Sequence, residues 1–99
     1  MNKPLIITYD LCGEGKDYDS LIDAIKNYPL WFRITESFWL IFTSDSCISV
    51  RDNLASYMDS DDRLFVALLE GSSAWKNTRC TSSKLKAALD EYAQSKKNS

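Results

Sequence analysis

The order of apolar and polar positions along the chain predicts a series of short strands and helices. Residues 4–11 are mostly β-branched, aromatic or aliphatic and apolar on both faces, which is typical of a central strand that begins at a proline. Residues 12–16 contain two glycines and predict a turn. From Asp17, a candidate N-cap, apolar side chains recur at helical spacing until Pro29 ends the run. The chain therefore begins with a predicted strand and helix.

The middle of the chain predicts a hairpin, a second helix and another strand. Residues 30–34 and 38–43 are strand-like, and the polar triplet between them predicts the turn. Ser44 or Ser46 can cap a helix that keeps the 3.6-residue apolar period until an acidic run ends it. The apolar residues of this helix are Cys47, Val50, Leu54 and Tyr57. Residues 63–70 then predict the fourth strand.

The last part of the chain predicts one more helix. Residues 71–81 are expected to be irregular or to form a short extra strand. Ser82 or Ser83 then opens a predicted helix over about 82–95. Its apolar stripe consists of Leu85, Ala88, Leu89, Tyr92 and Ala93. We expect residues 94–99 to fray.

This order of elements predicts the fold class. The pattern is β-α-β-β-α-β, in which two right-handed crossovers place both helices on one face of a four-stranded antiparallel sheet. We therefore expect an α+β, ferredoxin-like sandwich plus a C-terminal helix. With 99 residues and 44% hydrophobic content, the chain can build one core, so residues 1–99 are predicted to form one domain. Its core spans about residues 4–70, and a basic C-terminal extension follows.

The strands are apolar on both faces, so the sheet face away from the two predicted helices also needs cover. Leaving five or six large side chains there in water would forgo about ten kcal/mol. The cover is either the third helix folding back on its own sheet or a second copy packed face to face. We favour a homodimer through the sheet face, with the C-terminal tail contributing.

The cysteines and the lengths of the apolar runs indicate the compartment in which the protein works. Cys12, Cys47 and Cys80 are odd in number and widely spaced, and no signal-peptide pattern precedes them, so we expect free thiols in a cytoplasmic protein. No apolar run approaches the length of a membrane span, so no membrane partner is expected.

Charge is distributed unevenly along the chain. The net charge is -2, which argues against a highly basic protein that coats nucleic acid by charge alone. Residues 1–71 carry six basic and twelve acidic side chains, whereas residues 72–99 carry six basic and two acidic ones. The basic tail could meet phosphate or an acidic face of its own protein. The candidate nucleic-acid-binding residues are Lys76, Arg79, Lys84 and Lys86.

Carboxylates are the remaining candidates for catalysis, because the chain has no histidine. Asp10 stands out at the carboxyl end of an otherwise apolar strand. Its structural role would be to accept backbone N–H bonds or to pair with a cation. Its functional role would be as a ligand of Mg²⁺ or Mn²⁺, shared with a second Asp10 across a twofold axis, for hydrolysis of a phosphodiester.

Two further groups have structural and functional interpretations. Asp59, Asp61 and Asp62 could hold a metal, but a solvated turn between helix and strand is the interpretation we favour. Trp31 and Trp39 lie in strand patterns and predict core or interface positions. Trp75 lies in a polar, basic segment, where it docks on its own protein or contacts a partner. We favour docking.

Several of these residues together resemble a known family. The strand ending in Tyr9-Asp10-Leu11, the following loop and helix, the step Ser37-Phe38 and the strand from Leu64 to Leu69 resemble the Cas-two-like CRISPR-associated proteins. VapD-like ribonucleases are relatives of that family. The resemblance implies dimers that form through their sheets. It also implies either a metal-dependent nuclease that uses Asp10 or a DNA-binding scaffold without catalysis.

Two functions therefore stay open at this stage. We favour a dimeric, nucleic-acid-associated binding or scaffold module. The alternative is a metal-dependent endonuclease in which Asp10 of each protomer holds one Mg²⁺ or Mn²⁺ ion. The sequence does not decide between DNA, RNA and protein as the partner, nor between a CRISPR locus and a toxin-like system.

Overall fold

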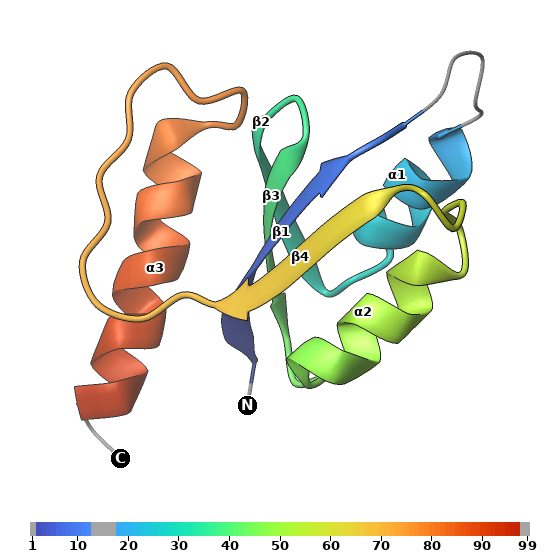
Figure 1. The fold of residues 1–99 in the computed structure, drawn as a ribbon. Coiled ribbons are helices and arrows are strands. Elements are labelled where there is room, and N and C mark those ends of the chain that lie inside the picture. The colour runs from blue at the N-terminus through green and yellow to red at the C-terminus, as the bar shows by residue number, and fades with distance from the viewer. Residues whose placement is uncertain (1, 13–17, 98–99) are drawn as a thin grey trace.

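The computed structural model of the protein describes residues 2–12 and 18–97, except for the side chain of residue 97. These residues form four strands and three helices (Figure 1). In chain order these are β1 (Lys3–Asp10), α1 (Asp19–Lys26), β2 (Leu30–Thr35), β3 (Phe38–Thr43), α2 (Cys47–Ala55), β4 (Arg63–Leu68) and α3 (Ser82–Lys97). The strands form one antiparallel sheet in the order β2-β3-β1-β4. The predicted α+β fold, with its ferredoxin-like order and C-terminal helix, is confirmed.

The main core lies between the sheet and the helices α1 and α2. The register pairs Leu5 of β1 with Ile41 of β3, and pairs Ile7 with Trp39, so these side chains share one face. Leu21 and Ile25 of α1, and Val50 and Leu54 of α2, complete this core. The Trp39 indole is fully buried, and its Nε1 donates a hydrogen bond to the Tyr9 hydroxyl at 3.1 Å. Trp39 is therefore a core residue.

The N-terminus of α2 has the cap that the sequence predicts at one of two serines. Ser46 is extended, and its hydroxyl accepts a hydrogen bond from the backbone N–H of Ser49 at 3.1 Å. The helix ends at Ala55, so Tyr57, which was expected on its apolar stripe, lies beyond it and is 44% exposed. The predicted cap Asp17 of α1 lies outside the described residues, and α1 begins at Asp19 without a side-chain cap.

Replacing Ser46 by alanine should lower the free energy of unfolding by about 1 kcal/mol, because the backbone N–H of Ser49 loses its acceptor. Urea denaturation followed by circular dichroism measures the change. Ser44→Ala is the matched control, since Ser44 precedes the cap and is exposed. Equal losses in the two variants would contradict the assignment of the cap.

Helix α3 covers the other face of the sheet (Figure 1). Its Leu85 is 2% exposed and packs with Phe32, Leu40 and Phe42, which point away from α1 and α2. The intramolecular alternative therefore holds where α3 packs on the sheet, whereas Phe65 of β4, on the same face, stays 62% exposed. We favoured a second copy as the cover, but α3 of the same chain packs on this face, because its apolar stripe matches the apolar side chains there. A homodimer stays a prediction.

The C-terminal end of α3 is longer than expected. Fraying was expected from Gln94 onward, but the helix continues to Lys97. Lys96 Nζ donates a hydrogen bond to Glu70 Oε1 at 2.7 Å and lies over the Tyr92 ring. The hydrogen bond to Glu70 raises the pKa of the Lys96 ammonium. This ion pair ties the last turns of α3 to the segment that follows β4.

The cysteines and the helices of the described residues bear on two of the predictions made from composition. The three cysteines are free thiols, as expected. Within residues 2–12 and 18–97, no helix combines the length and apolar character needed to cross a bilayer.

Candidate binding groove at the edge of the sheet

Asp10 lies at the end of β1, where the register places Arg63 of β4 directly opposite. Its carboxylate accepts a hydrogen bond from the Arg63 guanidinium at 2.9 Å, and the side chains are 68% and 75% exposed, respectively. Among the described residues, Asp10 belongs to no group of three potential metal ligands. This arrangement fits the structural interpretation of Asp10, a pair with a neighbouring cation. The nuclease interpretation would need a second chain and stays untested.

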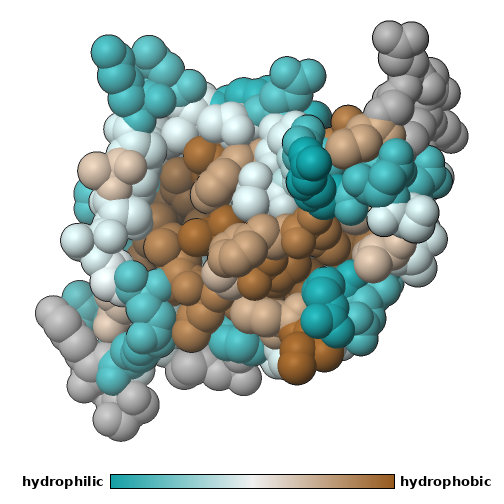
Figure 2. Space-filling model, viewed as in Figure 1, coloured by the Kyte–Doolittle hydropathy of each residue, from teal (hydrophilic) through white to brown (hydrophobic). Residues whose placement is uncertain are grey.

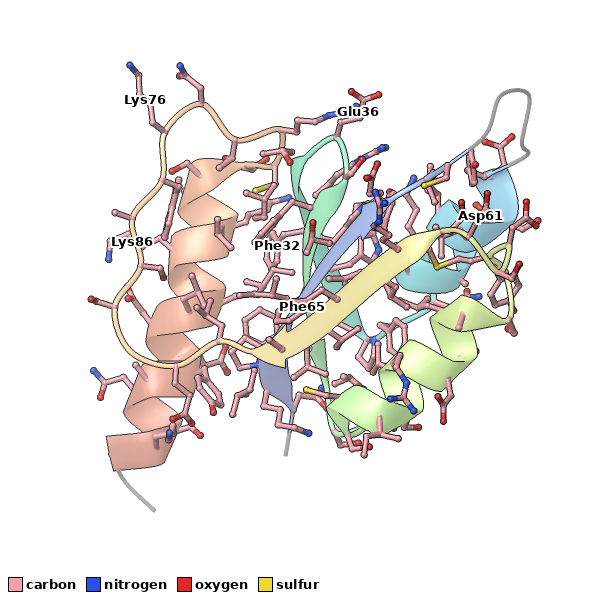
Figure 3. The ribbon with its side chains drawn as sticks, viewed as in Figure 1. Phe32, Glu36, Asp61, Phe65, Lys76 and Lys86 are labelled. Atoms are coloured by element: carbon pink, nitrogen blue, oxygen red, sulfur yellow. The ribbon has the colours of Figure 1, made fainter. Side chains whose placement is uncertain are left out.

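The acidic run between α2 and β4 brings three carboxylates within 4.8 Å of one another. Asp62 accepts hydrogen bonds from the backbone N–H groups of Cys12, at 2.8 Å, and Asp59, at 2.9 Å. These bonds close the turn and tie it to the end of β1. Asp61 lies in the same turn, at the surface near α1 and α2 (Figure 3). The hydrogen bonds support the turn interpretation.

The four candidate nucleic-acid-binding residues do not share one surface. Lys76 lies on the exposed segment between β4 and α3, and Lys86 lies on the outer side of α3 (Figure 3). Lys86 Nζ also forms an ion pair with Asp90 at 2.7 Å, one helical turn away. Only Arg79 and Lys84 line a common groove.

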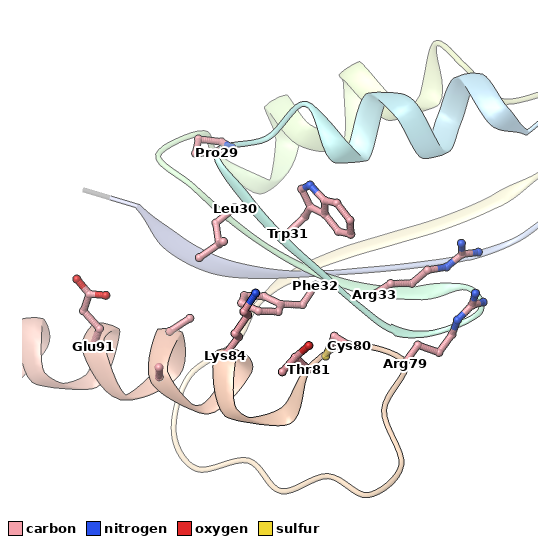
Figure 4. Close-up of a pocket in the computed structure, with 12 residues that line it drawn as sticks. Pro29, Leu30, Trp31, Phe32, Arg33, Arg79, Cys80, Thr81, Lys84 and Glu91 are labelled. Atoms are coloured by element: carbon pink, nitrogen blue, oxygen red, sulfur yellow. The ribbon is translucent and has the colours of Figure 1, made fainter.

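That groove runs between the edge strand β2 and helix α3 and has a volume of about 680 Å³ (Figure 4). Its lining residues are Pro29, Leu30, Trp31, Phe32, Arg33, Arg79, Cys80, Thr81, Lys84, Ala87, Ala88 and Glu91. Strand β2 has a strand neighbour on one side only, namely β3, so its other side borders the groove. The groove therefore combines an open strand edge with one face of a helix.

Three cationic side chains from three segments line this groove. They are Arg33 of β2, Arg79 of the loop that precedes α3, and Lys84 of α3. The backbone N–H of Arg79 donates to the Ile34 carbonyl at 3.0 Å, which holds the loop against the end of β2. Arg33 and Arg79 consequently lie at the same end of the groove (Figure 4). Sequence reasoning found Arg79 and Lys84 but missed Arg33.

Arg33 is held in place by partners that carry no negative charge. Its guanidinium donates to the Glu36 backbone carbonyl, at 2.7 and 3.2 Å, and lies 4.8 Å from the centre of the Trp39 ring. Within the described residues, no carboxylate forms an ion pair with Arg33, Arg79 or Lys84, and Glu91 is the one acidic residue that lines the groove. The groove therefore keeps an excess of positive charge in a protein whose net charge is -2.

Lys84 occupies an electrostatically unfavourable position. It is the third residue of α3, and no acidic residue lies in the first turn of that helix. The N-terminal end of a helix carries partial positive charge, so a cation there destabilises the helix by about 0.3–1 kcal/mol. The same end of α3 borders the groove through Thr81, which adds to its positive potential.

The three tryptophans have different positions. Trp31 is 38% exposed, but its indole lies on the α1 side of β2 and points away from α3 (Figure 4), with Lys26 Nζ 5.1 Å from its ring centre. Trp75 docks on its own protein, as favoured from the sequence. Its Nε1 donates to the Ser82 hydroxyl at 3.0 Å, and its ring packs against the outer core near Leu85. Of the aromatic residues that line the groove, Phe32 is therefore the one whose ring faces α3.

Comparisons with known proteins give no family for this chain. No model of a known protein family matches it, and no solved structure matches it either. The resemblance to the Cas-two-like family stays a prediction.

Proposed function

We propose that the protein is a binding module for single-stranded nucleic acid and that the groove between β2 and α3 is its binding site. The observation that carries the proposal is the meeting of Arg33, Arg79 and Lys84, from three separate segments, on one groove. None of these cations has a carboxylate partner among the described residues. A ligand that brings its own negative charge would supply one.

The shape and chemistry of the groove favour a single strand over a duplex. Proteins bind single strands with a positively charged groove that follows the phosphates and with aromatic rings that contact the bases. Here the cations supply the first component, and the ring of Phe32, at the base of the groove, supplies the second. A duplex keeps its bases stacked inside and would offer only phosphates to such a groove.

Binding is favoured over catalysis because the candidate catalytic residue lies elsewhere. Asp10 is at the end of β1 beside β4, whereas the groove follows β2, which is the opposite edge of the sheet. Asp10 therefore cannot act on a phosphate that Arg79 and Lys84 hold in the same chain. The groove also consists of residues from one chain, so the proposed binding does not depend on a dimer.

The test compares two double variants with the same change of charge. Arg79→Gln with Lys84→Gln removes two groove cations, and Lys76→Gln with Lys86→Gln removes two cations outside the groove. We expect the first pair to weaken binding of a fluorescent single-stranded oligonucleotide at least tenfold. The slope of log affinity against log salt should also fall by about 1.4, at about 0.7 per lost phosphate contact. Fluorescence anisotropy at several salt concentrations measures both quantities.

The control pair should keep the affinity within about threefold and retain most of the salt slope, because Lys86 is already paired with Asp90. Lys84→Gln should leave thermal stability unchanged or slightly raised, because it removes a cation from the first turn of α3. A loss of binding in the single variant Lys84→Gln consequently cannot be attributed to unfolding. Equal weakening by both double variants, or no binding by the wild type at low salt, would refute the proposal.

A further inference from the structure

The outer face of the sheet is not completely filled by α3. An apolar hollow of about 230 Å³ remains between the sheet and the helix (Figure 2). The sheet contributes Ile6, Ile34, Phe38 and Leu40 to its wall, and α3 contributes Leu85 and Leu89. The hollow is a recess open on one side and not a closed void, so a ligand can reach it from solvent.

The hollow has one aromatic side wall that is held in place. Trp75 lies on the segment between β4 and α3 and lines the hollow from that side. Its hydrogen bond to Ser82 fixes the indole and uses its Nε1 donor. Phe38 supplies a second ring from β3. Aromatic side chains attract further rings in offset or edge-to-face arrangements, so this wall favours a planar aromatic ligand.

The lining also limits the charge of a ligand. Of the described residues around the hollow, Ser73 and Trp75 are the two whose side chains carry a polar group, and none is ionisable. An ion would lose its hydration there without a partner. An apolar cavity of about 150 Å³ in an engineered protein binds benzene, so about half as much space again admits one or two fused rings.

We infer that this hollow is a binding site for a small, uncharged aromatic molecule of one or two fused rings. Phe65 adds apolar surface on the same face of the sheet, since its register partner on β1 is Thr8, two residues from Ile6. Phe65 is 62% exposed, so this face of β4 is open to solvent. The hollow shares no lining residue with the groove between β2 and α3, and the inference is independent of the proposed function.

The experiment is a titration of the full chain with indole, followed by methyl and amide NMR. We expect saturable shifts of Ile6, Leu40 and Leu89 with a dissociation constant below about 1 mM, and at least tenfold weaker binding of the anion 2-naphthoate. Leu89→Phe fills the hollow and should weaken indole binding at least tenfold. Gln94→Phe adds the same ring at an exposed position of α3 and should leave binding unchanged.

Three results would overturn the inference: no saturable shifts, shifts confined to residues outside the hollow, or equal binding by Leu89→Phe. The position of the shifts in the wild type decides the question even where Leu89→Phe loses its folded spectrum.

Discussion

Replacing Leu85 by alanine should lower the free energy of unfolding by about 2–5 kcal/mol. Leu85 is 2% exposed and is the buried α3 residue of the cluster with Phe32, Leu40 and Phe42. Its truncation removes apolar contacts and leaves a cavity that the sheet cannot close. Urea denaturation, followed by tryptophan fluorescence and by circular dichroism, measures the loss.

Ile48→Ala is the control for this prediction, because Ile48 lies on α2 and is 63% exposed. It should change the free energy of unfolding by no more than about 0.5 kcal/mol. A loss below about 1 kcal/mol for Leu85→Ala would mean that α3 does not pack against the sheet in solution. The intramolecular cover of the outer face would then be wrong.

Tyr9→Phe should cost about 1–3 kcal/mol of stability, although it removes a single oxygen atom. The Tyr9 hydroxyl accepts the hydrogen bond from Trp39 Nε1 at 3.1 Å, and Trp39 is fully buried. Without this acceptor, a buried N–H group loses its partner, and the full desolvation penalty remains. The same denaturation experiment measures the difference.

Tyr57→Phe removes the same atom at an exposed site and is the matched control. Tyr57 is 44% exposed, so its hydroxyl can bond to water, and the variant should differ from the wild type by no more than about 0.5 kcal/mol. If the two variants lose equal stability, the hydrogen bond between Trp39 and Tyr9 does not contribute as argued.

The sequence predicted the elements of the fold well, because each has a strong local signal. Strand β3 has the predicted bounds, 38–43, since a polar turn precedes it and Ser46 caps the helix after it. The cover of the outer face could not be predicted with the same certainty. A strand that is apolar on both sides requires cover, but its pattern does not say which atoms provide it.

The candidate site was predicted in part. Lys84 and Lys86 are two positions apart on a helix, which is about 200° around its axis, so helical geometry alone argues against a shared surface. Arg33 was missed because it lies in an apolar strand, far from Arg79 in the sequence. The two meet only because the backbone N–H of Arg79 bonds to the Ile34 carbonyl. The pairing of Asp10 with Arg63 likewise depends on the register of β1 and β4.

The segment between Leu68 and Ser82 contains no helix or strand, yet it is the connection that carries α3 across the sheet (Figure 1). A linker of this kind lets a terminal helix leave its own sheet and occupy the equivalent place on a neighbouring molecule. Two chains that exchange α3 would each regain the contacts of Leu85 and the pairing of Lys96 with Glu70. Leu85→Ala would weaken such an exchanged pair as much as the single chain, so dimerisation and an intact outer core need not exclude each other.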